Sequence, residues 1–207
     1  MKDFGLVVIG AHFGVWLQGE IAKYKNQNIL LVEPVPYNYK ILQKSFGEQD
    51  NIFICTNAVF SENKVENFYF IKEDSIPKLG KHWASGIGSF NKQHILNHKT
   101  KRFKVEETDI DHIKVDFINF NELIKLYEIK SIDKLQIDVE GAEYNILNSI
   151  DYKKIEINKI LFESKHFDGT FKEGEKLNLI KEKLINNGYE LSQLDKENIL
   201  AKKLSLV

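Results

Sequence analysis

The sequence has 207 residues, is 43% hydrophobic, and carries 29 Lys plus Arg against 30 Asp plus Glu. This apolar content excludes a disordered chain, and the balanced charge argues against a protein whose main partner is a nucleic acid. No apolar run approaches the ~18 residues of a membrane span, and no signal peptide is expected at the start. Cys55 is the only cysteine, so an intrachain disulfide is excluded. We therefore predict a soluble, cytoplasmic protein of one domain, residues 1–207.

The first third of the chain alternates between short apolar runs and stretches with helical spacing. Strands are predicted at 4–9, 29–32 and 52–55, and helices at 15–24 and 37–46. Short continuous apolar runs are typical of strands buried on both faces of a parallel sheet. Strand-helix alternation at this spacing predicts a doubly wound α/β sheet.

The remainder continues the pattern after a polar interruption. A strand at 65–71 is followed by the polar segment 72–100, whose length in a compact domain is typical of a functional or mobile loop. The elements predicted after it are extended pieces at 103–105 and 113–118, a helix at 119–126, strands at 135–139 and 159–163 with a helix ending at 147 between them, a helix at 173–187, and strands at 189–194 and 199–206. Two closing antiparallel strands on a mainly parallel sheet resemble the seven-stranded methyltransferase variant of the Rossmann-like fold.

Ligands of open α/β sheets bind at the carboxyl ends of the strands, where the strand order reverses. Gly10 and Gly14 bracket a turn there, and the helix that follows is expected to offer free N–H groups to a carboxylate or phosphate. Glu33 lies 23 residues after Gly10, where an acidic side chain can accept two hydrogen bonds from a ribose diol. The alternatives are a plain strand-to-helix turn and a solvated carboxylate before Pro34.

A second group of carboxylates follows the strand at 135–139. Asp138, Glu140 and Glu143 crowd its end, and Glu163 is expected at the end of the adjacent strand. Carboxylates packed together repel one another, so they usually serve a cation, a proton or the donors of a ligand. The alternative is that Glu140 and Glu143 only favour the positive N-terminus of the helix they begin.

These residues carry a resemblance to a known family. The run from Leu135 to Glu143 (LQIDVEGAE), followed by Ile146 and Leu147, resembles the signature of the FkbM family of S-adenosylmethionine-dependent methyltransferases. The glycine turn at 10–14, Glu33-Pro34 and Glu163 occur in the order that this family has. The resemblance extends from about residue 5 to 166.

The resemblance implies S-adenosylmethionine as cofactor and methyl transfer to a hydroxyl group. The residues it assigns to the cofactor are Gly10, Ala11, His12 and Gly14 for the methionine end, Glu33 for the ribose, and Asn57 and Ala58 beside the adenine. Asp138 is expected next to the methyl group, with Glu163 or His166 helping to position or deprotonate the hydroxyl. The expected acceptor is a small molecule, a glycan or glycolipid precursor. Segment 72–100 is then a mobile loop on the acceptor side.

One departure from the family leaves other functions open. Val8 occupies a position where the family usually has an acidic residue, so a contact to the amino-acid end of the cofactor is missing or comes from elsewhere. A non-catalytic binding module is one alternative. A dinucleotide-dependent oxidoreductase is another, although a Gly-x-x-x-Gly turn counts against it.

A metal ion is not expected from the sequence. A divalent cation bridging Asp138 and Glu163 stays an alternative. The remaining histidines show no ligand-like spacing, so no zinc site is predicted; these are His82, His94, His98 and His112.

Overall fold

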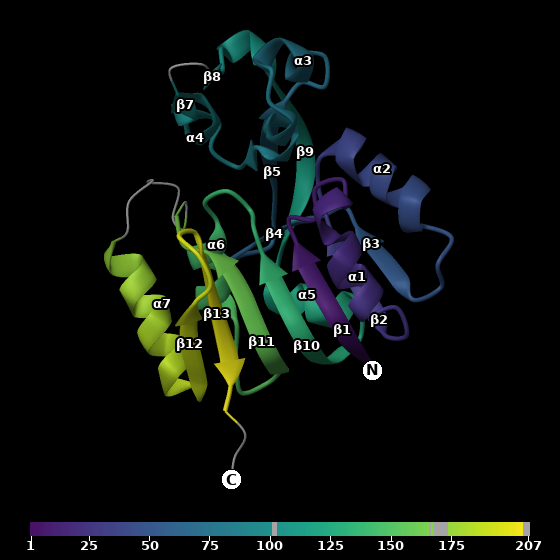
Figure 1. The fold of residues 1–207 in the computed structure, drawn as a ribbon, viewed down its shortest axis with the longest axis vertical. Helices are drawn as coiled ribbons and strands as arrows, with labels where there is room; N and C mark the ends of the chain where they lie inside the picture. Colours follow the sequence, from purple (N-terminus) through teal and green to yellow (C-terminus); the bar gives the residue numbers. More distant parts are fainter. Residues whose placement is uncertain (101–102, 166, 168–173, 205–207) are drawn as a thin grey trace.

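The chain folds around one seven-stranded sheet in the order β12-β13-β11-β10-β1-β2-β3, seen in the computed structural model in Figure 1. The structure describes residues 1–100, 103–165, 167 and 174–204. The strands are β1 (Lys2–Ile9), β2 (Asn28–Val32), β3 (Ile52–Cys55), β10 (Ile129–Ile137), β11 (Glu156–Glu163), β12 (Tyr189–Gln193) and β13 (Asn198–Lys203). Neighbours from β3 to β11 pair in parallel, whereas β13 pairs antiparallel with β11 and β12. The predicted α/β sheet with a C-terminal antiparallel hairpin is confirmed.

Both faces of this sheet are covered, which explains its continuous apolar strands. Val7 and Ile9 belong to the core cluster on one face, whereas Leu6 and Val8 belong to the cluster on the other. The covering helices are α1 (Gln18–Lys23) and α2 (Pro36–Phe46) on the Leu6 side, and α5 (Phe120–Leu126), α6 (Glu143–Ser149) and α7 (Glu175–Asn186) on the Val7 side. The parallel strands thus run toward a common edge, where their carboxyl ends meet.

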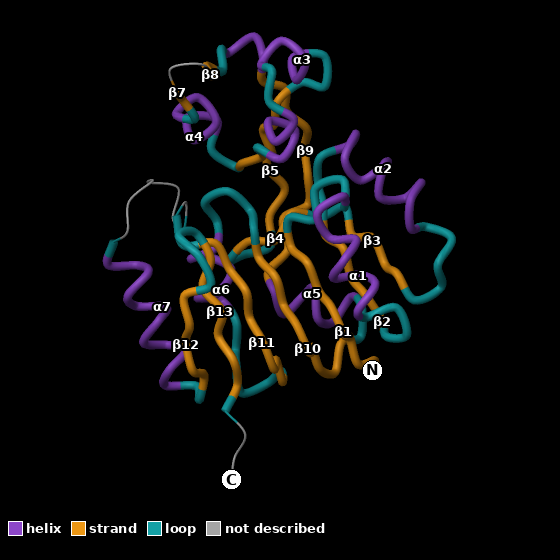
Figure 2. The backbone as a smooth tube through the Cα atoms, viewed as in Figure 1, coloured by secondary structure: helices purple, strands orange, loops and turns teal. Residues whose placement is uncertain are grey.

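A second, smaller sheet lies beyond that edge, with order β4-β9-β5-β6 (Figure 2). Its strands are β4 (Ala58–Phe60), β5 (Lys64–Ile71), β6 (Gly88–Ser89) and β9 (Ile110–Asn119), and the short strands β7 (Lys99–Thr100) and β8 (Phe103–Lys104) pair separately. The sequence predicts β5 and most of β9 but neither β4 nor the existence of a separate sheet.

The segment between β5 and β9 forms a small lobe rather than one long irregular loop. It holds α3 (Ser75–Leu79), the 3-10 turn η2 (His82–Gly86) and α4 (Lys92–Asn97). Apolar residues of this lobe share a core of their own, made of Ile71, Leu79, Ala84, Ile87, Ile95, Phe103, Val105 and Ile110. The expectation of a loop was therefore wrong about regular structure, and mobility on the acceptor side stays a prediction. Among the residues that the structure describes, no helix is long and apolar enough to cross a bilayer.

Candidate active site

The turn after β1 passes directly over the end of β10. Gly10 has φ 89°, and a Cβ at this position would lie 1.8 Å from the Asp138 carbonyl oxygen, so only glycine fits. The N–H groups of Gly10 and Ala11 both donate to the Val32 carbonyl, at 3.0 and 2.9 Å. The Gly14 N–H donates to the Ala11 carbonyl at 3.1 Å. These three N–H groups are therefore used inside the protein, and the expectation that the helix after the turn offers free N–H groups to a ligand stays a prediction.

Glu33 directly follows β2, and its buried carboxylate is held by backbone N–H groups. Its Oε2 accepts the His12 N–H at 2.8 Å and its Oε1 accepts the Val35 N–H at 2.9 Å. The Asn38 Nδ2 lies 3.5 Å from Oε1. Burial raises the pKa of Glu33 to about 7, against the effect of these donors. Each carboxylate oxygen has two lone pairs, so the fixed group can still accept ligand hydroxyls.

Two adjoining cavities open at this edge of the sheet and share Gly10, Glu33, Gly86 and Asp138 as lining. The first, about 540 Å³ including the part open to solvent, is mostly apolar. Its apolar lining includes Ile9, Val32, Val35, Ala58, Val59, Phe60, Phe68, Phe90 and Phe117. The second is more polar; its lining adds Ala11, His12, Trp16, Trp83, Gln136 and Glu140. An apolar slot beside a fixed carboxylate suits a nucleoside, with the base in the slot and the ribose on Glu33.

Asp138, Glu143 and Glu163 come together at the ends of β10 and β11, with carboxylate oxygens within 4.8 Å of one another. Glu143 is fully buried and accepts the N–H groups of Val139 and Gly141 at 2.7 and 2.9 Å. Burial raises the pKa of Glu143 well above its usual range, and the charges of Glu163 and Asp138 add to the shift. Glu143 therefore holds the turn after β10, while Asp138 is exposed to the cavity.

Several residues predicted for the site face elsewhere. Gly14 packs against α2, where a Cβ would meet Leu42 at 2.8 Å and Phe46 at 2.9 Å. The Asn57 side chain donates to the Asp116 carbonyl at 3.2 Å, whereas its neighbour Ala58 lines the cavity. His166 lies outside the described residues.

The lobe is tied to the sheet edge by Ser85 of η2. Its Oγ lies 2.6 Å from His12 Nε2, and its carbonyl accepts the Asn38 side chain at 2.9 Å. The His12 ring thus contacts the lobe, whereas its backbone N–H donates to Glu33. No local pattern in the sequence links Ser85 to His12, because the contact spans two separate elements.

Val8 is fully buried in the apolar cluster under α1 and α2. Its partner in the β1–β10 register, Gln136, lines the second cavity. Gln136 is the one polar residue within the apolar run from Leu135 to Ile137, and that break in the pattern is the signal that could have found it.

The sequence matches the methyltransferase FkbM domain over residues 9–191. The chain belongs to the FkbM methyltransferase family. The fold of the chain is similar to that of methyltransferase FkbM from Methylobacillus flagellatus KT, with a TM-score of 0.53 and 14% identity. That alignment covers 97% of this chain but only 43% of the other, so the chain spans less than half of its relative's length. At this identity the likeness shows the fold alone.

Two further solved structures are similar at lower scores. Precorrin-6y C5,15-methyltransferase from Geobacter metallireducens GS-15 has a TM-score of 0.47 at 11% identity, covering 98% of this FkbM chain and 82% of its own. Fibrillarin from Aeropyrum pernix, in complex with natively bound S-adenosyl-L-methionine, has a TM-score of 0.47 at 14% identity, covering 97% and 66%. No curated protein matches the sequence.

Proposed function

We propose that the chain is an S-adenosylmethionine-dependent methyltransferase that acts on a hydroxyl group of a small molecule, a glycan or glycolipid precursor. The observation that carries this proposal is Glu33, a buried carboxylate fixed by two backbone N–H groups beside an apolar cavity. Asp138 lines the same cavity. Membership of the FkbM family supports the reaction type.

The cofactor, when bound, supplies an electrophilic methyl group on a sulfonium cation. Glu33 would accept hydrogen bonds from the ribose hydroxyls, and the neighbouring Val35 and Ala58 would flank the adenine. Gln136 would contact the amino-acid end of the cofactor. It would take over the contact of the acidic residue that the family usually has at the position of Val8. The carboxylates at the other side of the cavity would favour the positive charge.

Asp138 and Glu163 would orient the acceptor hydroxyl and take its proton as the oxygen accepts the methyl group. Glu143 acts through the turn it holds, so it is a positioning residue for Asp138 rather than a catalytic one. His166 remains a candidate for the same proton. A base in this place needs only to be within hydrogen-bond reach of the hydroxyl.

Two exposed tryptophans support a carbohydrate acceptor. Trp16 is 64% exposed and Trp83 39% exposed, and both line the second cavity together with Asp138. Exposed aromatic faces beside polar groups are suited to the apolar faces of sugar rings, whose hydroxyls the carboxylates would bind.

Calorimetric titration tests the cofactor part. S-adenosylmethionine, S-adenosylhomocysteine and NAD are titrated separately into the purified chain, with and without magnesium. We expect both adenosyl ligands to bind, and Glu33→Gln to weaken them roughly 10- to 100-fold, the equivalent of a lost hydrogen bond to a charged group. Glu190→Gln, an exposed change on β12, is the matched control and should bind normally.

The other outcomes contradict the proposal in different ways. Binding of NAD alone would favour an oxidoreductase. Binding of none of the three to a folded chain would favour a non-catalytic module. Once adenosyl binding is established, transfer of a labelled methyl group to a panel of sugars tests the acceptor, and absence of transfer to all of them would reject the carbohydrate assignment.

A further inference from the structure

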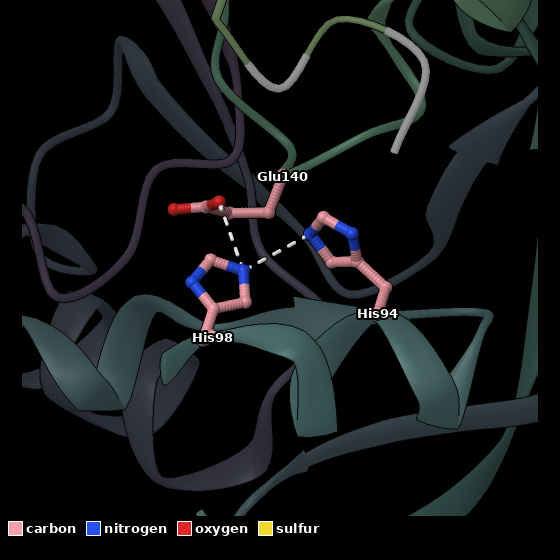
Figure 3. Close-up of side chains that lie close together, drawn as sticks. All are labelled: His94, His98 and Glu140. Carbon is pink, nitrogen blue, oxygen red and sulfur yellow. Dashed lines mark hydrogen bonds and ion pairs between the residues drawn. The ribbon is translucent and has the colours of Figure 1, made fainter. Parts of the chain in front are cut away.

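A second constellation lies at the edge of the same cavity, outside the carboxylate cluster. His94 and His98 from α4 and its C-terminal end meet Glu140 from the turn after β10 (Figure 3). The two His Nε2 atoms are 3.1 Å apart, and His98 Nε2 is 3.7 Å from Glu140 Oε2. Both histidines are buried, with exposed fractions of 3% and 9%. This proximity corrects the view that the histidines have no ligand-like spacing.

Local structure brings the three side chains together. The Asn91 side chain caps the start of α4 by accepting the Gln93 N–H at 3.0 Å. His94 lies within this helix, and His98 is the residue that caps its C-terminal end. Residues four apart lie on one face of a helix, which turns both imidazoles the same way. Glu140 has φ 56°, a left-handed conformation that costs a side-chain-bearing residue about 1–2 kcal/mol. Figure 3 shows its carboxylate turned toward the imidazoles from the opposite side.

The spacing suits a shared cation better than hydrogen bonds alone. The 3.7 Å between His98 Nε2 and Glu140 Oε2 is longer than a hydrogen bond, and an imidazole protonated at Nδ1 presents a lone pair at Nε2. A metal ion takes one lone pair from each donor. Zn–N distances of about 2.0–2.1 Å in a tetrahedral site place neighbouring donor atoms about 3.3 Å apart. The observed 3.1 and 3.7 Å bracket that value.

We propose that His94, His98 and Glu140 form a binding site for a divalent transition metal, with zinc as the ion that the donor set fits. Two imidazoles and one carboxylate are a donor set of zinc sites that keep a fourth position open. Glu140 lines the second cavity together with Asp138, so the proposed metal site adjoins the space where an acceptor would lie. Metal binding itself is independent of the proposed methyl transfer; only a role toward the acceptor rests on it.

The test is a zinc titration of the full chain after removal of metals with a chelator, read by competition with a chromophoric zinc indicator. We expect one tightly bound equivalent, and at least about 100-fold weaker binding in His98→Gln and in Glu140→Gln, since each removes a direct ligand. His112→Gln is the matched control, because His112 is exposed on β9 and should bind zinc like the unchanged chain. Cobalt(II) in place of zinc should give the visible absorption of a tetrahedral site.

Two results would overturn the proposal: zinc binding by the unchanged chain no tighter than by His98→Gln, or cobalt absorption that survives in that variant. If His98→Gln fails to fold, Glu140→Gln carries the same comparison from a half-buried position. Titrating S-adenosylmethionine into the metal-free chain separates the two proposals. Adenosyl binding without zinc binding rejects only the metal site, and zinc binding without adenosyl binding rejects only the proposed cofactor.

Discussion

Replacing Gly10 by alanine tests the geometry on which the whole site depends. The residue has φ 89°, which an L side chain adopts at a cost of about 1–2 kcal/mol. The new Cβ would lie 1.8 Å from the Asp138 carbonyl oxygen, so the end of β10 must move. That movement strains the hydrogen bond from the Asp138 N–H to the Ile9 carbonyl, now 2.9 Å, at about 1 kcal/mol, with overpacking adding about 1–3 kcal/mol.

The free energy of unfolding should therefore fall by about 3 to 6 kcal/mol in Gly10→Ala. Urea unfolding followed by circular dichroism measures it. With a urea m-value of about 2 to 3 kcal/mol/M, a loss of 4 kcal/mol lowers the midpoint by about 1.3 to 2 M.

Two other glycines separate the contributions. Gly80 has φ 65° with open space around it, so Gly80→Ala should cost only the conformational part, about 1–2 kcal/mol. Gly19 lies in α1, also with open space around it, and Gly19→Ala should stabilise by about 0.5–1 kcal/mol. Equal losses at Gly10 and Gly80 would refute the argument that the contact with Asp138 excludes a side chain.

Three further predictions concern buried polar groups. Burial raises the pKa of Glu33 from 4.5 to about 7, so the folded chain keeps a proton that the unfolded chain releases, and stability should decline by about 3 kcal/mol as pH rises through that window. In Glu33→Gln this part of the decline disappears from plots of unfolding free energy against pH, and parallel curves for the two proteins would contradict the assignment. Ser85→Ala removes the 2.6 Å contact with His12 and should lower the free energy of unfolding by about 1 kcal/mol in urea denaturation; an unchanged midpoint would mean that this contact does not hold the lobe. Cys55 is 1% exposed and burial raises its pKa, so a thiol reagent should label it at least about 100-fold more slowly in native buffer than in denaturant, and rapid native labelling would show that β3 opens readily.

The main sheet was predictable because its signal is local. A strand buried on both faces is a continuous apolar run, as in Ile29 to Val32, and its end is marked by the first polar or turn residue. The same rule places Glu33, Asp138 and Glu163 at one edge, since parallel strands end together. Predicted and observed strands differ mainly in length; β10 begins at Ile129 rather than at Leu135.

The rest of the site depends on contacts between distant segments. α4 is a short helix whose sequence, KQHILN, carries little apolar periodicity, so the shared face of His94 and His98 was not apparent. Glu140 points toward that helix because its backbone has a left-handed conformation, which the sequence around it does not predict. Asn57 lies next to Ala58, which lines the cavity, but its side chain donates to the Asp116 carbonyl on β9, a contact between segments far apart in the sequence.

The way the lobe joins the second sheet has a consequence for how the chain can vary. β5 and β9 are antiparallel neighbours, so the lobe departs at Ile71 and returns at Ile110, which face each other in the register. The Lys72 N–H donates to the Asp109 carbonyl at 2.8 Å and closes the two strands at this point. A segment that begins and ends on paired residues of neighbouring strands can be shortened, lengthened or exchanged without changing the strand order of the main sheet. The lobe, which lines both cavities through Gly86, is therefore a separable unit, and if the proposed function holds, exchanging it should change the range of acceptors with Glu33 and Asp138 left in place.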